Sequence, residues 1–399
     1  MNGIAKPTLS LFLEKLTWQL SLTGNLPLDV AWRMGGDIPQ HNLTRIHALI
    51  ANHAPINRWR SLYYVHSEQS SYCTAQAIAP TGEGFDSLES LNVQEDRLDS
   101  TVVHLLERTA LKLWRLRVKD HRHNGKIDAL EDTRNPVPVG IRPRITSLRY
   151  YGKWTTGGLR GFNNITHFAY NPPKISSIQR FPEIYLKDLY RLSIMLTNLV
   201  SLEAHLSPDS QMSSLNIDFP NLRHLVIGWG SGFPVTPFPS IWATLLERLD
   251  IRPYGEESGR EMVDNLQALF LTVPIDYRLV PRTLNLCIPM ELDKICIVLD
   301  HNPLVQHLKI TVDRLESVPY STVASLFTKR TTSVAGTVEW RYCPSLITLH
   351  ILLDWSSGDM SDWVHYAREI VKSRGGDGFL KVCVNWKDSQ EIEIHLKDV

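Results

Sequence analysis

Leu88-Glu89-Ser90-Leu91-Asn92-Val93 is the first clear copy of a short apolar phrase, L-x-x-L-x-I/V, that returns along the chain. Further copies run over residues 113–118, 199–202, 222–227, 246–251, 305–310 and 346–351. Apolar residues alternate with other residues in each phrase, which predicts a short strand with one buried face. The phrase decides the fold, because a strand that returns in this way indicates stacked repeats.

The second leucine-type position of each phrase marks the length of the repeats. These marker residues are Leu91, Leu116, Leu148, Phe168, Leu202, Leu225, Leu249, Leu284, Leu308 and Leu349. The successive gaps are 25, 32, 20, 34, 23, 24, 35, 24 and 41 residues. Several gaps fall in the window of about 20 to 29 residues that is typical of leucine-rich repeats, and the longer ones leave room for a helix. The Asn or Cys that usually follows the strand is mostly absent, so the repeats are expected to be irregular.

Apolar residues at helical spacing lie between some of the phrases. Leu43, Ile46, Leu49 and Ile50 would share one helical face, as would the apolar residues of 263–270. Strand, connection and strand at this spacing predict parallel strands with crossovers on the opposite side. We therefore predict an α/β fold, an irregular leucine-rich-repeat solenoid (horseshoe) with a parallel concave sheet and with helices and loops on the convex side.

Three segments of one continuous solenoid are expected, covering residues 1–66, 67–354 and 355–399. The first holds a capping helix at 8–21 and a β-α-β unit, and the second holds the irregular repeats. The third is a C-terminal cap with a helix that starts at Ser361 and stops before Gly375, followed by two short strands. Terminal repeats need such caps because their apolar face has no neighbour.

The composition argues against several classes of protein. The 399 residues contain 42 Lys plus Arg and 42 Asp plus Glu, so no global field favours nucleic acid or a membrane surface. No apolar run approaches the roughly 20 residues of a membrane span, and the N-terminus lacks a signal-peptide pattern. Five scattered cysteines, some in apolar phrases interpreted as strands such as Ile295-Cys296-Ile297, favour packed thiols. We expect an intracellular protein, cytoplasmic or nuclear.

Residues between the buried strand positions are expected to point onto the concave sheet. This face is rich in Arg and His, and a repeat array with such a face typically binds a protein. Any one of these positions could equally be an ordinary solvated residue. We expect the double change R248E/R252E to weaken partner capture and to leave the fold intact. The predicted contact residues are Arg117, Arg149, His205, His224, Arg248, Arg252, His307 and His350.

One segment of the chain is strongly basic. Residues 111–150 hold ten basic side chains against four acidic ones, a net of +6, whereas residues 85–110 are acidic. A basic patch can meet phosphates, but this one shows no interleaved aromatic pattern for stacking. We interpret it as a solvated loop around Pro136, Pro138 and Pro143, and expect no nucleic-acid partner.

Residues typical of catalysis occur only in isolation. His121 and His123 have no third ligand at a recognised spacing. Residues 228–232 lack the G-x-S-x-G order and are interpreted as a loop between repeats, and residues 375–378 follow a helix instead of opening one. No P-loop or dinucleotide fingerprint is present. We predict that the chain is not an enzyme and has no catalytic residue, metal site or cofactor.

The segment Ser21-Leu-Thr-Gly-Asn-Leu-Pro-Leu-Asp-Val30 resembles the "sGNLPLdv" phrase of the large F-box-like protein families of mushroom-forming fungi. As in those families, a helix and an Arg-Trp-x-x-Leu strand follow, here at 58–62. Residues 219–225 and 343–349 also resemble the "fPnLrhL" and "CPsL" phrases of F-box leucine-rich-repeat proteins. The resemblance implies the substrate-receptor part of a ubiquitin ligase.

The F-box itself, which in these families docks on a Skp adaptor, would precede this region, and Leu9 to Leu20 is too short to supply it. A Skp adaptor is therefore expected as a partner only if an F-box exists outside this chain. Two alternatives remain open: an interaction scaffold with no ubiquitin link, and an enzyme with an unrecognised site.

Overall fold

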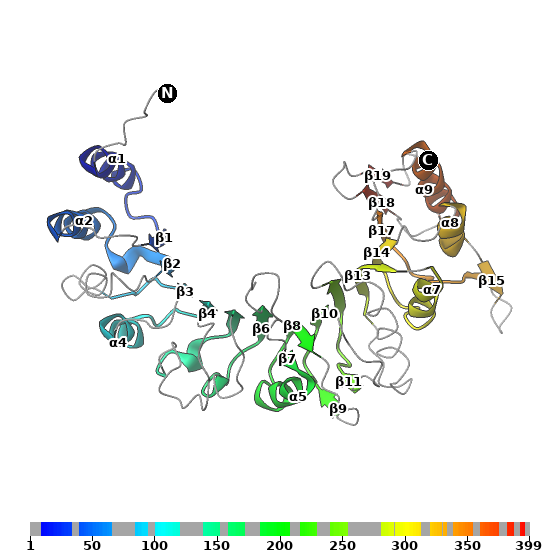
Figure 1. Cartoon of the computed structure of the whole chain (residues 1–399), viewed down its shortest axis with the longest axis horizontal. Helices are drawn as coiled ribbons and strands as arrows, with labels where there is room; N and C mark the ends of the chain where they lie inside the picture. Colours follow the sequence, from blue (N-terminus) through cyan, green and yellow to red (C-terminus); the bar gives the residue numbers. More distant parts are fainter. Residues whose placement is uncertain are drawn as a thin grey trace, which may run out of the picture. The chain divides into compact units, whose positions relative to one another are not determined.

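The computed structural model describes residues 9–33, 40–65, 84–94, 100–119, 139–151, 159–171, 184–207, 216–229, 240–253, 281–290, 292–312, 320–328, 330–332, 338–353, 360–374, 381–386 and 392–395. The chain divides into two compact units, Met1–Pro182 and Glu183–Val399. Each unit is built on a parallel sheet that does not close, with few helices among the described residues (Figure 1). The α/β class predicted from the sequence is confirmed.

Unit 1 contains parallel strands that lie side by side in the order of the sequence. They are β1 (Leu28–Arg33), β2 (Trp59–Val65), β3 (Ser90–Gln94), β4 (Arg115–Lys119), β5 (Ser147–Tyr151) and β6 (His167–Asn171). The α-helices described in this unit are α1 (Leu9–Ser21), α2 (Gln40–His53) and α4 (Ser100–Thr109). In Figure 1, α2 and α4 lie on the same side of the neighbouring strands. This is the parallel arrangement with crossovers on one side that the spacing of the phrases predicted.

Unit 2 repeats the same arrangement over a longer sheet. Its parallel strands are β8 (Ser201–Ser207), β10 (His224–Trp229), β12 (Arg248–Pro253), β13 (Thr283–Met290), β14 (His307–Val312), β17 (Thr348–Leu353) and β18 (Lys381–Trp386). The short strand β7 (Ile184–Tyr185) pairs with β8, and β19 (Ile392–His395) pairs antiparallel with β18. The predicted pair of terminal strands therefore forms a hairpin at the end of this sheet.

The α-helices described in unit 2 are α5 (Leu186–Met195), α7 (Leu292–Asp300), α8 (Tyr320–Thr328) and α9 (Met360–Arg374). In Figure 1, α7, α8 and α9 lie on one side of β13 to β18, and α9 contacts β18. The described part of the unit also contains two small two-stranded sheets. One pairs β9 (Asn216–Asp218) with β11 (Ser240–Trp242), and the other pairs β15 (Arg330–Thr332) with β16 (Val338–Trp340).

The marker residues form one row across each sheet. In unit 1 the row is Val30, Leu62, Leu91, Leu116, Leu148 and Phe168. In unit 2 it is Leu202, Leu225, Leu249, Leu284, Leu308, Leu349 and Val382. All of these except Val30 are buried. A register slip of one residue would expose the whole row, so the apolar pattern fixes the strand alignment.

A buried turn precedes many strands, and its repetition was not predicted. The amide of the leucine-type residue that opens each phrase donates a hydrogen bond to the carbonyl three residues earlier, as in Leu88 to Phe85 (3.1 Å) and Leu222 to Phe219 (3.2 Å). The start of many strands is also hydrogen-bonded to the start of the strand before it. At the start of β4, for example, the amides of Trp114 and Arg115 donate to the carbonyl of Glu89, which precedes β3. These hydrogen bonds satisfy the backbone where each repeat enters the sheet.

Some local predictions were wrong or incomplete. Ile295-Cys296-Ile297 lies in helix α7 and not in a strand, because Ile295, Val298 and Leu299 are buried at helical spacing. Gly228 and Trp229 belong to strand β10 and not to a loop. Helix α9 begins at Met360, so Ser361 lies within it and does not precede it. The predicted N-terminal helix is present as α1, with Leu13 buried and Leu11, Phe12 and Trp18 exposed.

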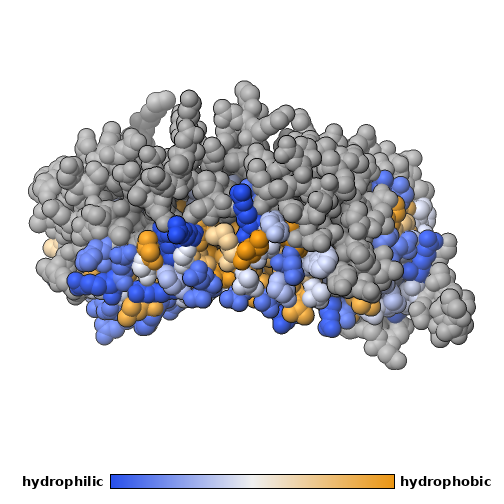
Figure 2. Space-filling view, turned by 90° about the horizontal axis from the view of Figure 1, so that it is seen from below, coloured by the Kyte–Doolittle hydropathy of each residue, from blue (hydrophilic) through white to orange (hydrophobic). Residues whose placement is uncertain are grey.

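The exposed apolar side chains are dispersed among polar ones. The visible face in Figure 2 shows hydrophilic residues interspersed with apolar ones over the described part of the chain. Large exposed apolar residues include Leu111, Leu245 and Leu304, each in the turn that leads into a strand. Single exposed apolar residues of this kind are ordinary features of a protein surface.

Candidate functional site

The candidate site is the side of each sheet that faces away from the marker row, which we call the polar face. Its residues alternate with the buried positions along each strand, at one or three residues from the marker. In unit 1 they include Arg115, Arg117, Ser147, Arg149 and His167. In unit 2 they include Glu203, His224, Arg248, Asp250, Asn285, His307, Lys309, Thr348 and His350. Each of the eight contact residues predicted from the sequence lies on the polar face of its unit.

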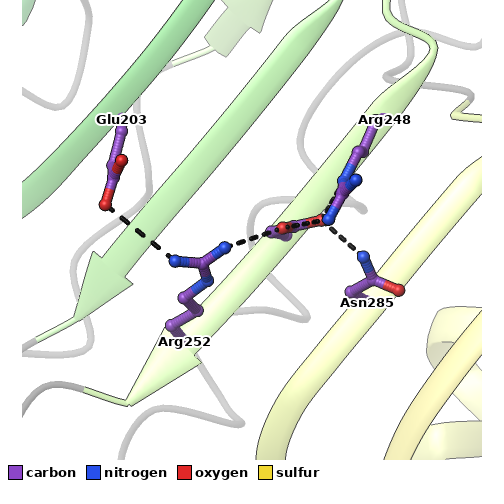
Figure 3. A network of polar contacts seen from close by, with 5 residues as sticks. Glu203, Arg248, Arg252 and Asn285 are labelled. Carbon is purple, nitrogen blue, oxygen red and sulfur yellow. Dashed lines mark hydrogen bonds and ion pairs between the residues drawn. The ribbon is translucent and has the colours of Figure 1, made fainter. Parts of the chain in front are cut away.

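A carboxylate at the centre of the polar face of unit 2 organises the side chains around it. Arg248 donates two hydrogen bonds to Asp250, from Nε (2.8 Å) and from a terminal nitrogen (2.9 Å). Arg252 donates a third (3.1 Å) and Asn285 a fourth (2.6 Å), so strands β12 and β13 are joined through this carboxylate (Figure 3). The other side of Arg252 lies 3.9 Å from Glu203 on β8. We call these five residues the Asp250 network.

The Asp250 network is partly a structural element. The side chain of Asp250 is only 3% exposed, whereas those of Arg248 and Arg252 are 48% exposed. Burial by itself raises the pKa of Asp250, but the hydrogen bonds from Arg248, Asn285 and Arg252 outweigh it and hold the pKa below the usual value. As a residue between buried strand positions, Asp250 would be expected to be exposed. It is buried instead, and Arg248 and Arg252 of its own strand and Asn285 of β13 all bind it.

His205 lies beside this network, over a glycine. A Cβ atom placed on Gly228 would be 2.1 Å from Nδ1 of His205, so the strand residue opposite the histidine has to lack a side chain. Burial, helped by the positive charge of Arg252, lowers the pKa of His205 to about 4. His205 is therefore a neutral, half-buried side chain near pH 7 and not the exposed contact that its position in the strand suggested.

The remaining histidines of the predicted set differ in their surroundings. His224 is exposed at the start of β10. His307 is half-buried, with Nδ1 2.9 Å from the hydroxyl of Thr348 on the next strand. His350 is also half-buried, and it lies opposite Lys309 in the register of β17 and β14. The structure thus brings His205 and Arg252 together in unit 2 and places His307 and His350 on neighbouring strands.

The polar face of unit 1 carries arginines that interact with aromatic rings. Arg117 and Arg149 are direct partners across β4 and β5, and both are exposed. The guanidinium of Arg117 lies 4.6 Å from the ring centre of Tyr151, and that of Arg115 lies 4.6 Å from the ring of Trp114. These distances are those of cation–π contacts. Arg115 and Tyr151 were not among the contact residues predicted from the sequence.

The basic segment has aromatic partners that the sequence did not predict. Its arginines at 115, 117 and 149 lie on strands, and two of them stack on aromatic rings. The aromatic pattern was missed because Tyr151 meets Arg117 across two strands and not along the sequence. Arg144 is bound instead to the carbonyls of Ala110 and Glu107. Residues 120–138, which include His121 and His123, lie outside the described residues.

Other predicted features also lie outside the described part of the chain. These are the helical face at 263–270, the glycines of 230–232 and 375–378, and Cys73. Within the described residues, no group of three His, Cys, Asp or Glu side chains could hold a metal ion. Nor does any helix in these ranges combine the length and apolar character that a membrane crossing requires.

Comparison with protein-family models and with curated proteins found no match for this chain.

Proposed function

We propose that this protein is a leucine-rich-repeat scaffold that binds a protein partner through the polar face of its parallel sheets, as a non-enzymatic protein inside the cell. The observation that carries the proposal is the shared strand register. It lines up side chains from distant parts of the sequence in continuous rows that alternate with the buried marker row. Repeat proteins use such extended faces to bind other proteins.

The chemistry of the polar face supports a protein partner. It combines arginine, histidine, tyrosine and hydroxyl or amide side chains, which suit mixed hydrogen bonding and stacking. The irregular marker spacing and the buried turn before the strands support assignment of the repeats to the leucine-rich type.

The resemblance of residues 21–30 to the F-box-like families supports a narrower proposal: a substrate receptor of a ubiquitin ligase. A scaffold without a ubiquitin link is the second candidate. In both candidate functions the polar face binds the partner. The two differ in whether other proteins, a Skp adaptor and a cullin, are bound together with that partner.

Site-specific photo-crosslinking in the full chain tests the proposal. A photoreactive residue is placed on the polar face of each unit, at Asn92 and at Val226, and at two exposed helical controls, Arg108 and Lys372. We expect one partner to crosslink from the polar face and not from the helices. Equal crosslinking from the helical positions would contradict the proposal. A Skp adaptor and a cullin in the captured material would favour the substrate receptor, and their absence the unlinked scaffold.

A further inference from the structure

The arginines of β4 and β5 form a cluster of like charges on the polar face of unit 1. Arg117 faces Arg149 directly across the two strands, and Arg115 stands two residues before Arg117 on the same side of the sheet. All three side chains are exposed. Exposed guanidinium groups gathered in this way can bind an anion through their N–H groups.

The described part of unit 1 supplies no such anion to Arg115 or Arg117. Neither makes an ion pair with a described residue, and their side-chain contacts are with the rings of Trp114 and Tyr151. Stacking occupies the flat side of a guanidinium and leaves its N–H edge available for bidentate binding of a carboxylate. In β12, by contrast, Asp250 occupies the position equivalent to Arg117 and binds the neighbouring arginines from within the chain.

Neutral hydrogen-bonding groups surround the cluster. Ser90 on β3 and Ser147 on β5 are the strand partners of Arg115, and Asn92 on β3 is the partner of Arg117. All three are partly exposed. A ligand with several oxygen acceptors would therefore find donors on both sides of the arginines.

The cluster is also limited in extent. On the β1 to β3 side, Asp29 binds Arg60, and exposed Glu89 precedes β3. On the other side, the residue opposite Arg149 in the register of β5 and β6 is Ala169, which is uncharged. A long polyanion such as nucleic acid would meet the carboxylates at 29 and 89, and the chain as a whole carries no net charge. A short acidic peptide segment fits these limits better.

We propose that Arg115, Arg117 and Arg149 bind a short Asp- or Glu-rich segment of the protein partner, lying across β4 and β5. This inference rests on the proposed function and assigns one chemistry to one part of the polar face. The carboxylates of the segment would bind the N–H edges of the guanidinium groups.

The test measures binding of a fluorescent peptide of alternating Glu and Ser to the full chain, with the matching Gln peptide for comparison. We expect binding of the Glu peptide that weakens with salt, and that becomes about tenfold weaker or more in R117E/R149E. The matched control R108E/K372E makes the same change in net charge at exposed helical positions and should bind normally. If R117E/R149E does not fold, as judged by circular dichroism, R117Q/R149Q replaces it.

Three results would overturn the inference. They are an equal loss of binding in the control, tighter binding of an oligonucleotide that the same variant abolishes, and binding only when the Ser residues of the peptide are phosphorylated. Failure of the proposed function is distinguishable. A partner that still crosslinks from the polar face in R117E/R149E would leave the scaffold proposal intact and refute the acidic segment. Peptide binding without any captured partner would support the acidic-peptide site and count against the scaffold proposal.

Discussion

Strands β4 and β12 share a pattern of basic, Leu, charged, β-branched and basic residues, Arg-Leu-Arg-Val-Lys at 115–119 and Arg-Leu-Asp-Ile-Arg at 248–252, with their markers in the same place. The middle residue changes the behaviour of the arginines. In β12, Asp250 is buried and binds the arginines on both sides of it. In β4, Arg117 occupies that position and stacks on Tyr151, and the arginines remain exposed. The carboxylate at the middle position thus ties the arginines of β12 to the sheet, whereas the arginines of β4 have no such carboxylate within their strand.

The largest expected effect comes from reversing both arginines of the Asp250 network. R248E/R252E would leave a buried carboxylate beside two added ones, and breaking a buried ion pair typically costs about 3–5 kcal/mol. The earlier expectation that this double change leaves the fold intact is therefore replaced by one of marked destabilisation. Urea unfolding monitored by circular dichroism measures the loss in free energy.

The matched control is R115E/R117E in β4. Its side chains are exposed and make no ion pair within the described residues, so the free energy of unfolding should change by about 1 kcal/mol or less. Similar losses in the two variants would show that Asp250 does not distinguish the two strands.

A smaller effect is expected from acidification, through His205. Its pKa is lowered to about 4 in the folded chain by burial and by the charge of Arg252, from an ordinary value of 6.5. The unfolded chain therefore binds more protons between these pH values, and stability falls as the pH decreases from 6.5 to about 4. The loss reaches at most about 3 kcal/mol, since one pKa unit corresponds to about 1.4 kcal/mol.

Urea unfolding of the wild type and of H205Q at pH 7 and at pH 4.5 isolates the contribution of His205. H205Q should lose less stability on acidification, while H224Q, changed at an exposed histidine of β10, should behave like the wild type. An identical pH dependence in wild type and H205Q would mean that His205 becomes protonated in the folded protein as readily as in the unfolded one.

The charge of Asp250 itself is tested by D250N, which keeps the shape of the side chain. At pH 7 the variant should lose about 2 kcal/mol, because hydrogen bonds to a charged acceptor are replaced by weaker ones. The folded pKa of Asp250 lies below its ordinary value of 3.8, so its stabilising effect is complete above that pH and is lost as the pH falls through the folded pKa. The difference in the free energy of unfolding between wild type and D250N should therefore become smaller below pH 3.8.

Unfolding curves for wild type and D250N at a series of acidic pH values measure this difference. D29N in unit 1 is the comparison, because Asp29 and its partner Arg60 are both largely exposed and such pairs contribute little. A difference for D250N that stays constant or grows in acid would contradict the assignment of a charged, hydrogen-bonded Asp250.

The sequence predicted the sheet better than the surface chemistry. The marker row was found because burial on one face imposes a local alternating pattern on every strand. The burial of Asp250 could not be found in this way, since Asn285 binds it from the next strand and Glu203 approaches its partner Arg252 from β8. The same holds for Gly228, whose role depends on His205 in β8. Cys296 was misassigned because a short apolar run does not distinguish a strand from a buried helix.

The smallest expected effect concerns the stacking of Arg117 on Tyr151. In a double-mutant cycle with R117A and Y151L, we expect a coupling energy of about 0.5–1 kcal/mol, as for exposed cation–π pairs. The cycle of R248A with D250A should give a clearly larger coupling, because Arg248 makes two hydrogen bonds to a buried carboxylate. A weak coupling would let Arg117 leave Tyr151 for the proposed acidic segment at little cost, whereas Arg248 would give up two hydrogen bonds to a buried carboxylate. Equal couplings in the two cycles would remove this distinction between the arginines of the two strands.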